Sequence, residues 1–318
     1  MFSNFLSGIL NYGRRNLSEF KFQWQTPRRR RDFLTGLAFL SPSLIALLIF
    51  TYIPIAWAFN LSFTSWEARS TPDAFIGLQN YTYTLSEPEF WNAFKNTLYF
   101  SAIKIPLDMV LALGIALLLN QKLRGIGFFR MAYFLPVITS VVAVAAIWRV
   151  IYNPSFGLLN SLLESLGLPA QRWLRDPNLA MPSVAFVALW KGLGYDVVIF
   201  LAGLQSISRM YYEAAEIDGA SAWQRFRFIT FPLLSPVTFF VLVVGIINSF
   251  KVFSLIHVLA PDGGPLNSAE VIVFYLYRLA FQEFKFGQAA AVSFILLAVV
   301  LCITYVQRRF IEPRVNYE

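Results

Sequence analysis

Long apolar runs separated by short polar stretches recur along the whole chain. Each run is long enough for an α-helix to cross a bilayer, which takes about 20 residues at a rise of about 1.5 Å per residue. The pattern therefore predicts an all-α, polytopic membrane protein with six transmembrane helices. The predicted spans are Phe33 to Phe63, Asn96 to Leu119, Met131 to Tyr152, Ser183 to Leu204, Phe231 to Ile256 and Phe286 to Val306.

Basic residues alternate between the polar stretches, and this alternation predicts the orientation. The stretches on one side hold Arg14, Arg15, Lys21, Arg28, Arg29, Arg30, Arg31, Lys122, Arg124, Arg130, Arg209, Arg225, Arg227, Arg308, Arg309 and Arg314. Those on the other side hold only Arg69, Lys95, Arg172, Arg175, Arg278 and Lys285. Because Lys and Arg gather on the cytoplasmic side of membranes, we expect both termini and the region around Tyr211 to face the cytoplasm.

The composition supports a lipid-embedded chain. Of 318 residues, 57% are hydrophobic and only 14% charged, whereas soluble domains carry about a quarter charged residues. The net charge of +8 is then a consequence of topology, and nucleic-acid binding is disfavoured because no soluble domain remains to carry a binding face. The single cysteine, Cys302, excludes an intrachain disulfide, and its apolar surroundings predict a buried side chain.

The first 32 residues form a separate region in this interpretation. Apolar residues recur there at helical spacing with Arg14 and Arg15 opposite, which predicts an interfacial helix on the inner leaflet, ended by Pro27. A disordered basic tail is the alternative. A secretory signal is disfavoured because its positive charge would precede the apolar core. The membrane domain then covers residues 33–310, and 311–318 form a cytoplasmic tail.

Motifs for catalysis are missing from the sequence. There is no phosphate-binding loop, no dinucleotide-binding glycine pattern, no His-Glu-x-x-His pair and no Cys/His cluster. The sequence therefore argues against catalysis by this chain alone, and no cofactor or metal is expected on it.

A polar, helix-forming segment from Tyr211 to Pro236 lies between the fourth and fifth apolar runs. We expect acidic residues near the start of a helical turn, a bend at Gly219, a second short helix from Trp223 to Ile229, and Pro232 before the next span. Small side chains would let a partner backbone come close, while Glu213 offers a carboxylate. The predicted docking residues are Glu213, Ala214, Ala215, Asp218, Gly219 and Ala220. An ordinary interfacial connection between two spans is the alternative.

At these residues the chain resembles the membrane permeases of ATP-binding-cassette (ABC) importers. Their signature is Glu-Ala-Ala, a Gly four residues after the second Ala, and a Pro about a dozen further on, which matches Glu213 to Ala215, Gly219 and Pro232. The carbohydrate-importing branch (maltose, glycerol-3-phosphate and multiple-sugar permeases) is similar around Tyr152 to Asn160 and Gly263 to Pro265.

This resemblance implies a bacterial inner-membrane machine. The segment at about 207–230 would form coupling helices that insert into a cleft of an ATP-hydrolysing subunit, where Glu213 pairs with a basic residue. The expected partners are a second, homologous permease in a heterodimer, two ATP-binding subunits, an extracytoplasmic solute-binding protein and membrane lipids. ATP and Mg²⁺ would be held by the partner subunits, and the cargo would be a sugar, glycoside or polyol.

Two polar clusters inside the spans suggest a substrate path, because polar groups in a membrane tend to face a cavity or one another. The residues are Trp190, Lys191, Gly192, Tyr195 and Asp196 in the fourth span, and Asn248, Ser249, Phe250 and Lys251 in the fifth. We expect the glycines to loosen the fourth helix. The resembled permeases line their sugar site from matching positions. An ion pair between Lys191 and Asp196 with helix-packing polar residues is the alternative, and Lys104 and Asp108 are expected to neutralise each other.

Two other function classes remain open at this point. An ion-gradient-driven secondary transporter would show inverted repeats and interrupted helices in both halves, and neither is evident. A non-transporting scaffold subunit would not need polar clusters in two spans.

Overall fold

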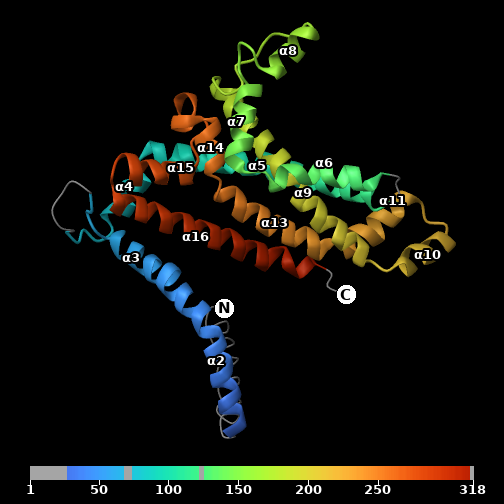
Figure 1. Cartoon of the computed structure of the whole chain (residues 1–318), viewed down its shortest axis with the longest axis horizontal. Coiled ribbons are helices and arrows are strands. Elements are labelled where there is room, and N and C mark those ends of the chain that lie inside the picture. The colour runs from blue at the N-terminus through green and yellow to red at the C-terminus, as the bar shows by residue number, and fades with distance from the viewer. Residues whose placement is uncertain (1–26, 68–73, 122–124, 316–318) are drawn as a thin grey trace. The chain divides into compact units, whose positions relative to one another are not determined.

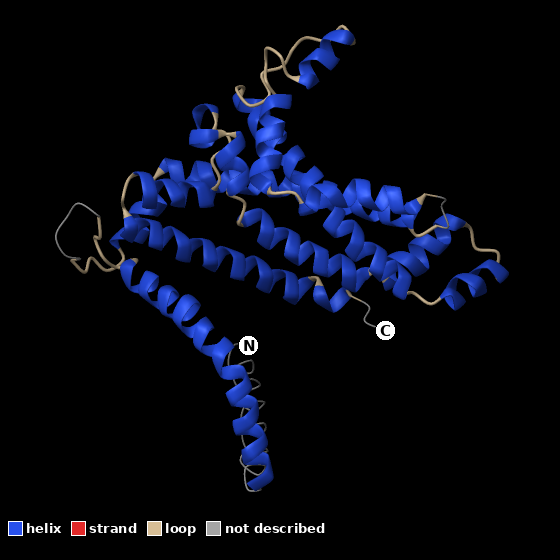
Figure 2. Ribbon diagram, in the orientation of Figure 1, coloured by secondary structure: helices blue, strands red, loops and turns tan. Residues whose placement is uncertain are grey.

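A computed structural model describes residues 27–67, 74–121 and 125–315 of the chain. Throughout these ranges the regular structure is helical, with two isolated bridges and no strand (Figure 2). The predicted all-α class is confirmed. The helices are α2 (Pro27–Leu47), α3 (Ile53–Leu61), α4 (Gln79–Ser86), α5 (Pro88–Leu119), α6 (Ile126–Ile138), α7 (Val141–Ile151), α8 (Leu158–Ser165), α9 (Pro177–Ser206), α10 (Arg209–Ile217), α11 (Ala222–Arg225), α12 (Phe231–Leu233), α13 (Ser235–Phe250), α14 (Ser254–Leu259), α15 (Ile272–Tyr277) and α16 (Phe286–Phe310).

The chain divides into two compact units, Met1–Asn60 and Leu61–Glu318. In the first, α2 and α3 join through a π-helical turn into one apolar helix from Arg30 to Leu61, which agrees with the first predicted span. The expected interfacial helix lies outside the described residues. Pro27, expected to end that helix, is the first residue of α2.

Three further helices are long and apolar enough to cross a membrane: α5, α9 and α16. They correspond to the second, fourth and sixth predicted spans. The second begins at Pro88 instead of the predicted Asn96, because Pro88 occupies the first helical turn, where a missing N–H costs nothing.

The third and fifth predicted spans correspond to bent pairs of helices, a feature that the prediction did not specify. Gly127–Ile138 and Val141–Ile151 meet at 100°, because Thr139 and Ser140 both leave the helical conformation. Residues Ala222–Leu233 and Ser235–Phe250 meet at 62°. Hydropathy gives the length of an apolar run but not a change in the direction of the helix.

The fifth helix also ends earlier than predicted. It stops at Phe250, and Phe253 adopts a non-helical conformation (φ −144°, ψ −64°) before the short α14 begins. The predicted continuation to Ile256 therefore crosses a break in the backbone.

The core of the Leu61–Glu318 unit is built around α5, which packs along α9 and also contacts α13 and α15. Ala112 and Ala116 of α5 are fully buried with Val197 and Phe200 of α9. Small side chains at such a contact let helix backbones approach closely, which is the main source of packing energy between helices in lipid.

Glycine in α9 has a packing role that differs from our expectation. The helix runs without interruption through Gly192 and Gly194, so they do not loosen it. A Cβ on Gly194 would lie 2.2 Å from the carbonyl oxygen of Tyr133, so this glycine lets α6 pack directly on the α9 backbone.

The prediction for Cys302 was also wrong: its side chain is exposed on α16.

The short helices that connect the long ones lie at two opposite ends of this unit. Figure 1 shows α10 and α11 at the end where α9 finishes, with the last turns of α16 toward the same end, and α4 and α15 at the opposite end. This grouping agrees with the alternation of basic residues. Which end faces the cytoplasm stays a prediction.

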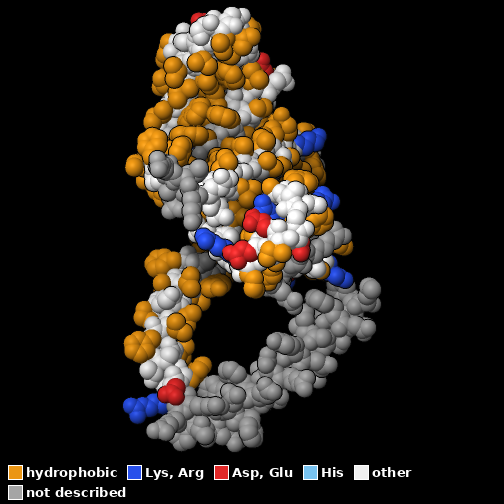
Figure 3. Space-filling view, turned by 90° about the vertical axis from the view of Figure 1, so that its right-hand side faces the viewer, with side chains coloured by type: hydrophobic (Ala, Val, Ile, Leu, Met, Phe, Trp, Pro, Cys, Tyr) orange, Lys and Arg blue, Asp and Glu red, His pale blue; other side chains and the backbone are white. Residues whose placement is uncertain are grey.

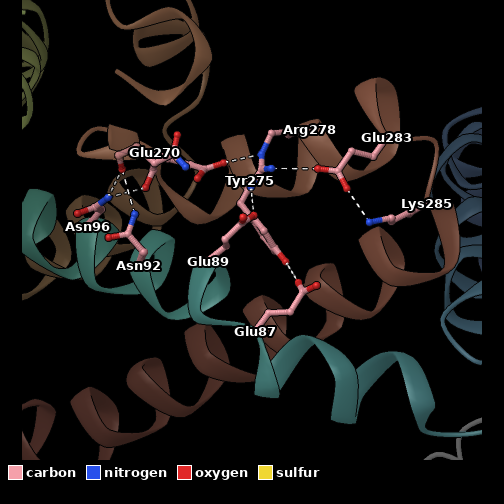
Figure 4. A network of polar contacts seen from close by, with 10 residues as sticks. Glu87, Glu89, Asn92, Asn96, Glu270, Tyr275, Arg278, Glu283 and Lys285 are labelled. Atoms are coloured by element: carbon pink, nitrogen blue, oxygen red, sulfur yellow. Dashed lines mark hydrogen bonds and ion pairs between the residues drawn. The ribbon is translucent and has the colours of Figure 1, made fainter. Parts of the chain in front are cut away.

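A carboxylate network joins α4, α5, α15 and α16 at the end opposite α10 (Figure 4). Arg278 bonds three carboxylates: Glu89 at 2.7 Å, Glu270 at 2.9 Å and Glu283 at 3.0 Å. Lys285 also pairs with Glu283, at 2.8 Å. The remaining members are Glu87, bonded by Tyr275 and Gln288, and Asn92 and Asn96, which donate to backbone carbonyls of residues 267 and 270.

The surroundings of Glu270 and Lys285 in the network raise the pKa of both groups. Burial raises the pKa of the Glu270 carboxyl, and the adjacent Arg278 opposes that rise. The hydrogen bond from Lys285 to Glu283 raises the pKa of the Lys285 ammonium. Arg278 thus offsets only part of the effect of burial, and the pKa of Glu270 stays above its ordinary value.

Candidate functional site

The predicted docking residues lie on α10 and on the turn that follows it. The side chain of Ser208 caps the helix by accepting a hydrogen bond from the backbone N–H of Met210. The helix therefore begins earlier than expected. Glu213 lies in its middle and Asp218 at its C-cap, so placing these acids at the helix start was wrong.

Gly219 ends α10 in the left-handed conformation, with φ +76°. The backbone N–H of Ala220 donates to the carbonyl of Ala215 at 2.8 Å, and that of Gly219 to Glu216 at 3.1 Å. This pair of bonds is the Schellman arrangement, in which glycine avoids the strain that a Cβ imposes. The expected bend at Gly219 is present.

Two side-chain contacts hold the second arm of the 207–230 segment against α10. Arg225 pairs with Glu216, and the hydroxyls of Tyr212 and Thr230 are 3.0 Å apart. Ser221 caps α11 in a reciprocal capping box with Gln224. A π-helical turn, Phe226–Thr230, then leads into α12. The segment is thus a hairpin of two short helices joined by these two contacts.

The hairpin exposes most of the predicted docking residues. Glu213, Ala214, Asp218 and Gly219 are exposed, while Ala215 and Ala220 are half-buried. On the face of the molecule that carries α10 and α11, acidic and basic side chains gather in one area beside hydrophobic ones (Figure 3).

Sequence reasoning missed the apolar part of this surface. Met210 is 67% exposed, Ile217 87% and Trp223 65%. Met210, Ala214 and Ile217 are spaced i, i+4, i+7 and so share one face of α10. That spacing is legible in the sequence once the helix is known to start at Arg209. Large exposed apolar side chains beside charges are typical of a surface that a protein partner covers.

The substrate-path residues of α9 point to different neighbours. The Lys191 ammonium donates to the carbonyls of Pro136 and Val137 on α6, both at 3.4 Å. Asp196 instead interacts with Asp108 and Lys104 of α5. The alternative ion pair between Lys191 and Asp196 is therefore absent from the described part of the chain.

Lys104 and Asp108 pair with each other on α5, as expected. They also lie against Gly192, where a Cβ would be 3.8 Å from the Lys104 ammonium. One carboxylate oxygen of Asp108 is buried and has no hydrogen-bond partner within the described ranges. The Lys104–Asp108 pair and Asp196 thus form one polar cluster between α5 and α9. The side chains of Trp190 and Tyr195, also on α9, are exposed.

The second predicted cluster, at the end of α13, is divided between surface and interior. Asn248 and Lys251 are exposed, whereas Ser249 and Phe250 are buried. The Ser249 hydroxyl is without a hydrogen-bond partner among the residues the structure describes. The helices that carry the two clusters, α9 and α13, contact each other, and α5 packs against both.

Comparisons with known proteins agree with this architecture. Residues 104–317 match the family model "Binding-protein-dependent transport system inner membrane component". A probable ABC transporter permease of Pyrococcus horikoshii is 37% identical, covering 87% of this chain and 95% of that protein. The sn-glycerol-3-phosphate transport system permease UgpA of Agrobacterium fabrum is 36% identical, covering 87% and 94%.

A solved structure of a bacterial ABC transporter involved in import of the acidic polysaccharide alginate has a similar chain. The TM-score is 0.77 at 29% identity, covering 88% of this chain and 97% of that one. The same transporter bound to its alginate-loaded periplasmic protein gives a TM-score of 0.75, with 88% and 96% covered. The described residues contain four helices able to span a membrane, or six if each bent pair is one span. Together with the matches, this architecture leads to one assignment: the chain belongs to the binding-protein-dependent transport system inner membrane components, the multi-pass permeases of ABC transporters.

Proposed function

We propose that this permease forms half of the translocation pathway of an ATP-driven importer for a carbohydrate or polyol, and that the 207–230 segment receives the work of ATP hydrolysis from a separate subunit. The observation that carries the proposal is the exposed face of α10, where Glu213 and Ala214 lie beside Met210 and Ile217. The hairpin can pass movement of a docked subunit to the membrane helices, because its two arms are joined by the Glu216–Arg225 and Tyr212–Thr230 contacts.

The remaining parts of the machine follow from the family. A second, homologous permease completes the pathway as a heterodimer, two ATP-binding subunits hold ATP and Mg²⁺, and an extracytoplasmic binding protein delivers the solute. The alginate transporter supports this arrangement because it was solved with its periplasmic protein. Relatives named for glycerol-3-phosphate and alginate transport support a carbohydrate or polyol cargo.

The substrate path is proposed along α9 and α13. Tyr195 and Trp190 offer aromatic faces to sugar C–H groups, and Asn248 offers an amide to hydroxyls. Asp196 joins this path together with its neighbours Lys104 and Asp108 on α5. Lys191, held by α6 carbonyls, acts in positioning α9 against α6.

Single-cysteine cross-linking tests the docking role. Cys302 is the sole cysteine and is exposed, so it is first replaced by Ser. Ile217→Cys then probes the hairpin, and Leu266→Cys at the other end is the control, because the two positions are 87% and 88% exposed. In native membranes we expect Ile217→Cys to capture an ATPase subunit and Leu266→Cys not to. An ATPase captured equally by both, or by neither, contradicts the proposal.

A further inference from the structure

A cavity of about 290 Å³ is lined by residues at the end of α7 and after α14. Figure 1 shows these two helices away from α10 and α11. The walls of the cavity come from three places: the end of α7, the loop that leads into α9, and the loop that follows α14. Representative lining residues are Arg149, Asn153, Leu174, Arg175, Pro261 and Gly264. The two loops belong to stretches predicted to face outside the cell, where a solute arrives.

Two guanidinium groups border this cavity without a carboxylate to neutralise them. Arg149 comes from the last turn of α7 and Arg175 from the loop before α9. Neither takes part in an ion pair within residues 27–67, 74–121 and 125–315. Of the acids nearby in sequence, Asp176 caps α9 by accepting from the N–H of Asn178 at 2.8 Å, and exposed Asp262 pairs with neither arginine.

Arg149 and Arg175 are exposed side chains, and their surroundings differ from those of the arginine in the carboxylate network. Arg278 is surrounded by three carboxylates of the chain itself. Arg149 and Arg175 converge on an open cavity instead. A guanidinium binds carboxylates and phosphates through paired N–H donors, so both side chains are available to an anionic occupant of the cavity.

The size and the other walls favour a small molecule over a single acidic side chain. At about 30 Å³ per water, the cavity has room for roughly ten waters, which is more than one carboxylate fills. Leu174, Leu259 and Pro261 add apolar faces that fit the C–H groups of a sugar ring or polyol. Small-molecule sites combine such walls with a few polar groups that fix orientation.

We propose that this cavity binds the anionic group, a carboxylate or a phosphate, of a carbohydrate or polyol solute, with Arg149 and Arg175 as the two donors. The inference rests on the proposed function, since it takes the occupant to be cargo. It makes the cavity an entry site that selects anionic over neutral solutes before they reach α9 and α13.

Binding to the purified full-length chain in detergent, without other subunits, tests the proposal. The probes are glucuronate for a carboxylate, glycerol 3-phosphate for a phosphate, and glucose and glycerol as their neutral counterparts. We expect at least one anion to bind and the neutral probes not to. Each of Arg149→Gln and Arg175→Gln should weaken binding by at least about tenfold, the loss of a charge-assisted hydrogen bond. Added salt should weaken it as well.

Arg172→Gln is the matched control, because Arg172 is an exposed arginine of the same loop that does not line the cavity. It should bind the anion as the wild type does. Binding of glucose or glycerol as tight as that of the anions, equal losses in the Arg172 variant, or no binding of either anion would overturn the proposal. Because no ATPase is present, this result is independent of the cross-linking at Ile217.

Discussion

The 207–230 hairpin and the carboxylate network are both rich in charge, yet they are built in opposite ways. The hairpin is made by contacts between residues close in sequence, such as Ser221 with Gln224 and Glu216 with Arg225. The network is closed by residues 189 positions apart, Glu89 and Arg278, and it buries the Glu270 carboxylate. The hairpin leaves apolar side chains such as Ile217 exposed. We propose that the first region binds a partner subunit, whereas the second holds the chain's own helices together.

The largest effect is expected in the network. Arg278→Gln removes the partner of Glu270, which is 1% exposed and would be left as an uncompensated buried charge. Breaking a buried pair in this way costs about 3–5 kcal/mol. We expect a marked fall in the thermal unfolding temperature of the purified chain. Arg308→Gln is the control, since Arg308 is 80% exposed in its pair with Glu312. Equal stability of the two variants would mean that the network does not hold the helices.

In the hairpin, the largest effect is expected at Gly219. Gly219→Val places a Cβ at φ +76°, which strains the turn although no atom lies within 4 Å of it. The ATPase subunit recovered with a tagged permease should fall at least about tenfold, equivalent to 1.4 kcal/mol.

Gly77→Val provides the matched control for this variant. Gly77 also has positive φ (+60°) and open space around it, but it lies outside the hairpin. It should cause similar local strain and leave ATPase recovery unchanged. If both variants lose the ATPase equally, strain alone is the cause and the hairpin is not the docking surface.

A smaller effect is expected for the ion pair between the two arms of the hairpin. Glu216 is 61% exposed in this pair, and exposed pairs contribute about 0.2–1 kcal/mol. Glu216→Gln should therefore change the unfolding temperature little and reduce ATPase recovery by less than about fivefold. Tyr212→Phe, which removes the bond to Thr230, should act in the same direction. A complete loss of ATPase recovery in either variant would show that the contact contributes far more to docking than an exposed pair is expected to.

The smallest effect concerns pH. Because the Lys285 pKa is raised in the folded chain, its pairing with Glu283 contributes stability below the unfolded pKa and loses it as pH rises through the folded pKa. We expect the difference in unfolding temperature between wild type and Lys285→Gln to be present at neutral pH and to vanish only above about pH 10.5. A difference that persists unchanged at higher pH would exclude ionisation of Lys285 as its cause.

The sequence is sufficient for features that depend on local order. Apolar length predicts the spans at α5, α9 and α16, and the spacing of Glu213, Gly219 and Pro232 locates the hairpin. Features that depend on direction or distant contacts escape it. The 100° bend after α6 interrupts an unbroken apolar run, and nothing near Arg278 in sequence announces Glu89. Likewise, the sequence allows an ion pair between Lys191 and Asp196, but Lys191 contacts α6 and Asp196 interacts with residues of α5.

The central claim is that this permease works only as part of an assembly driven by ATP-hydrolysing subunits. Native mass spectrometry of the tagged chain, extracted from its own membranes, tests this claim most directly. The account predicts one copy of the chain with a second permease and two ATPase subunits, and loss of the ATPases alone in the Gly219→Val variant. A chain that is recovered without any ATPase, alone or as a homo-oligomer, would contradict it.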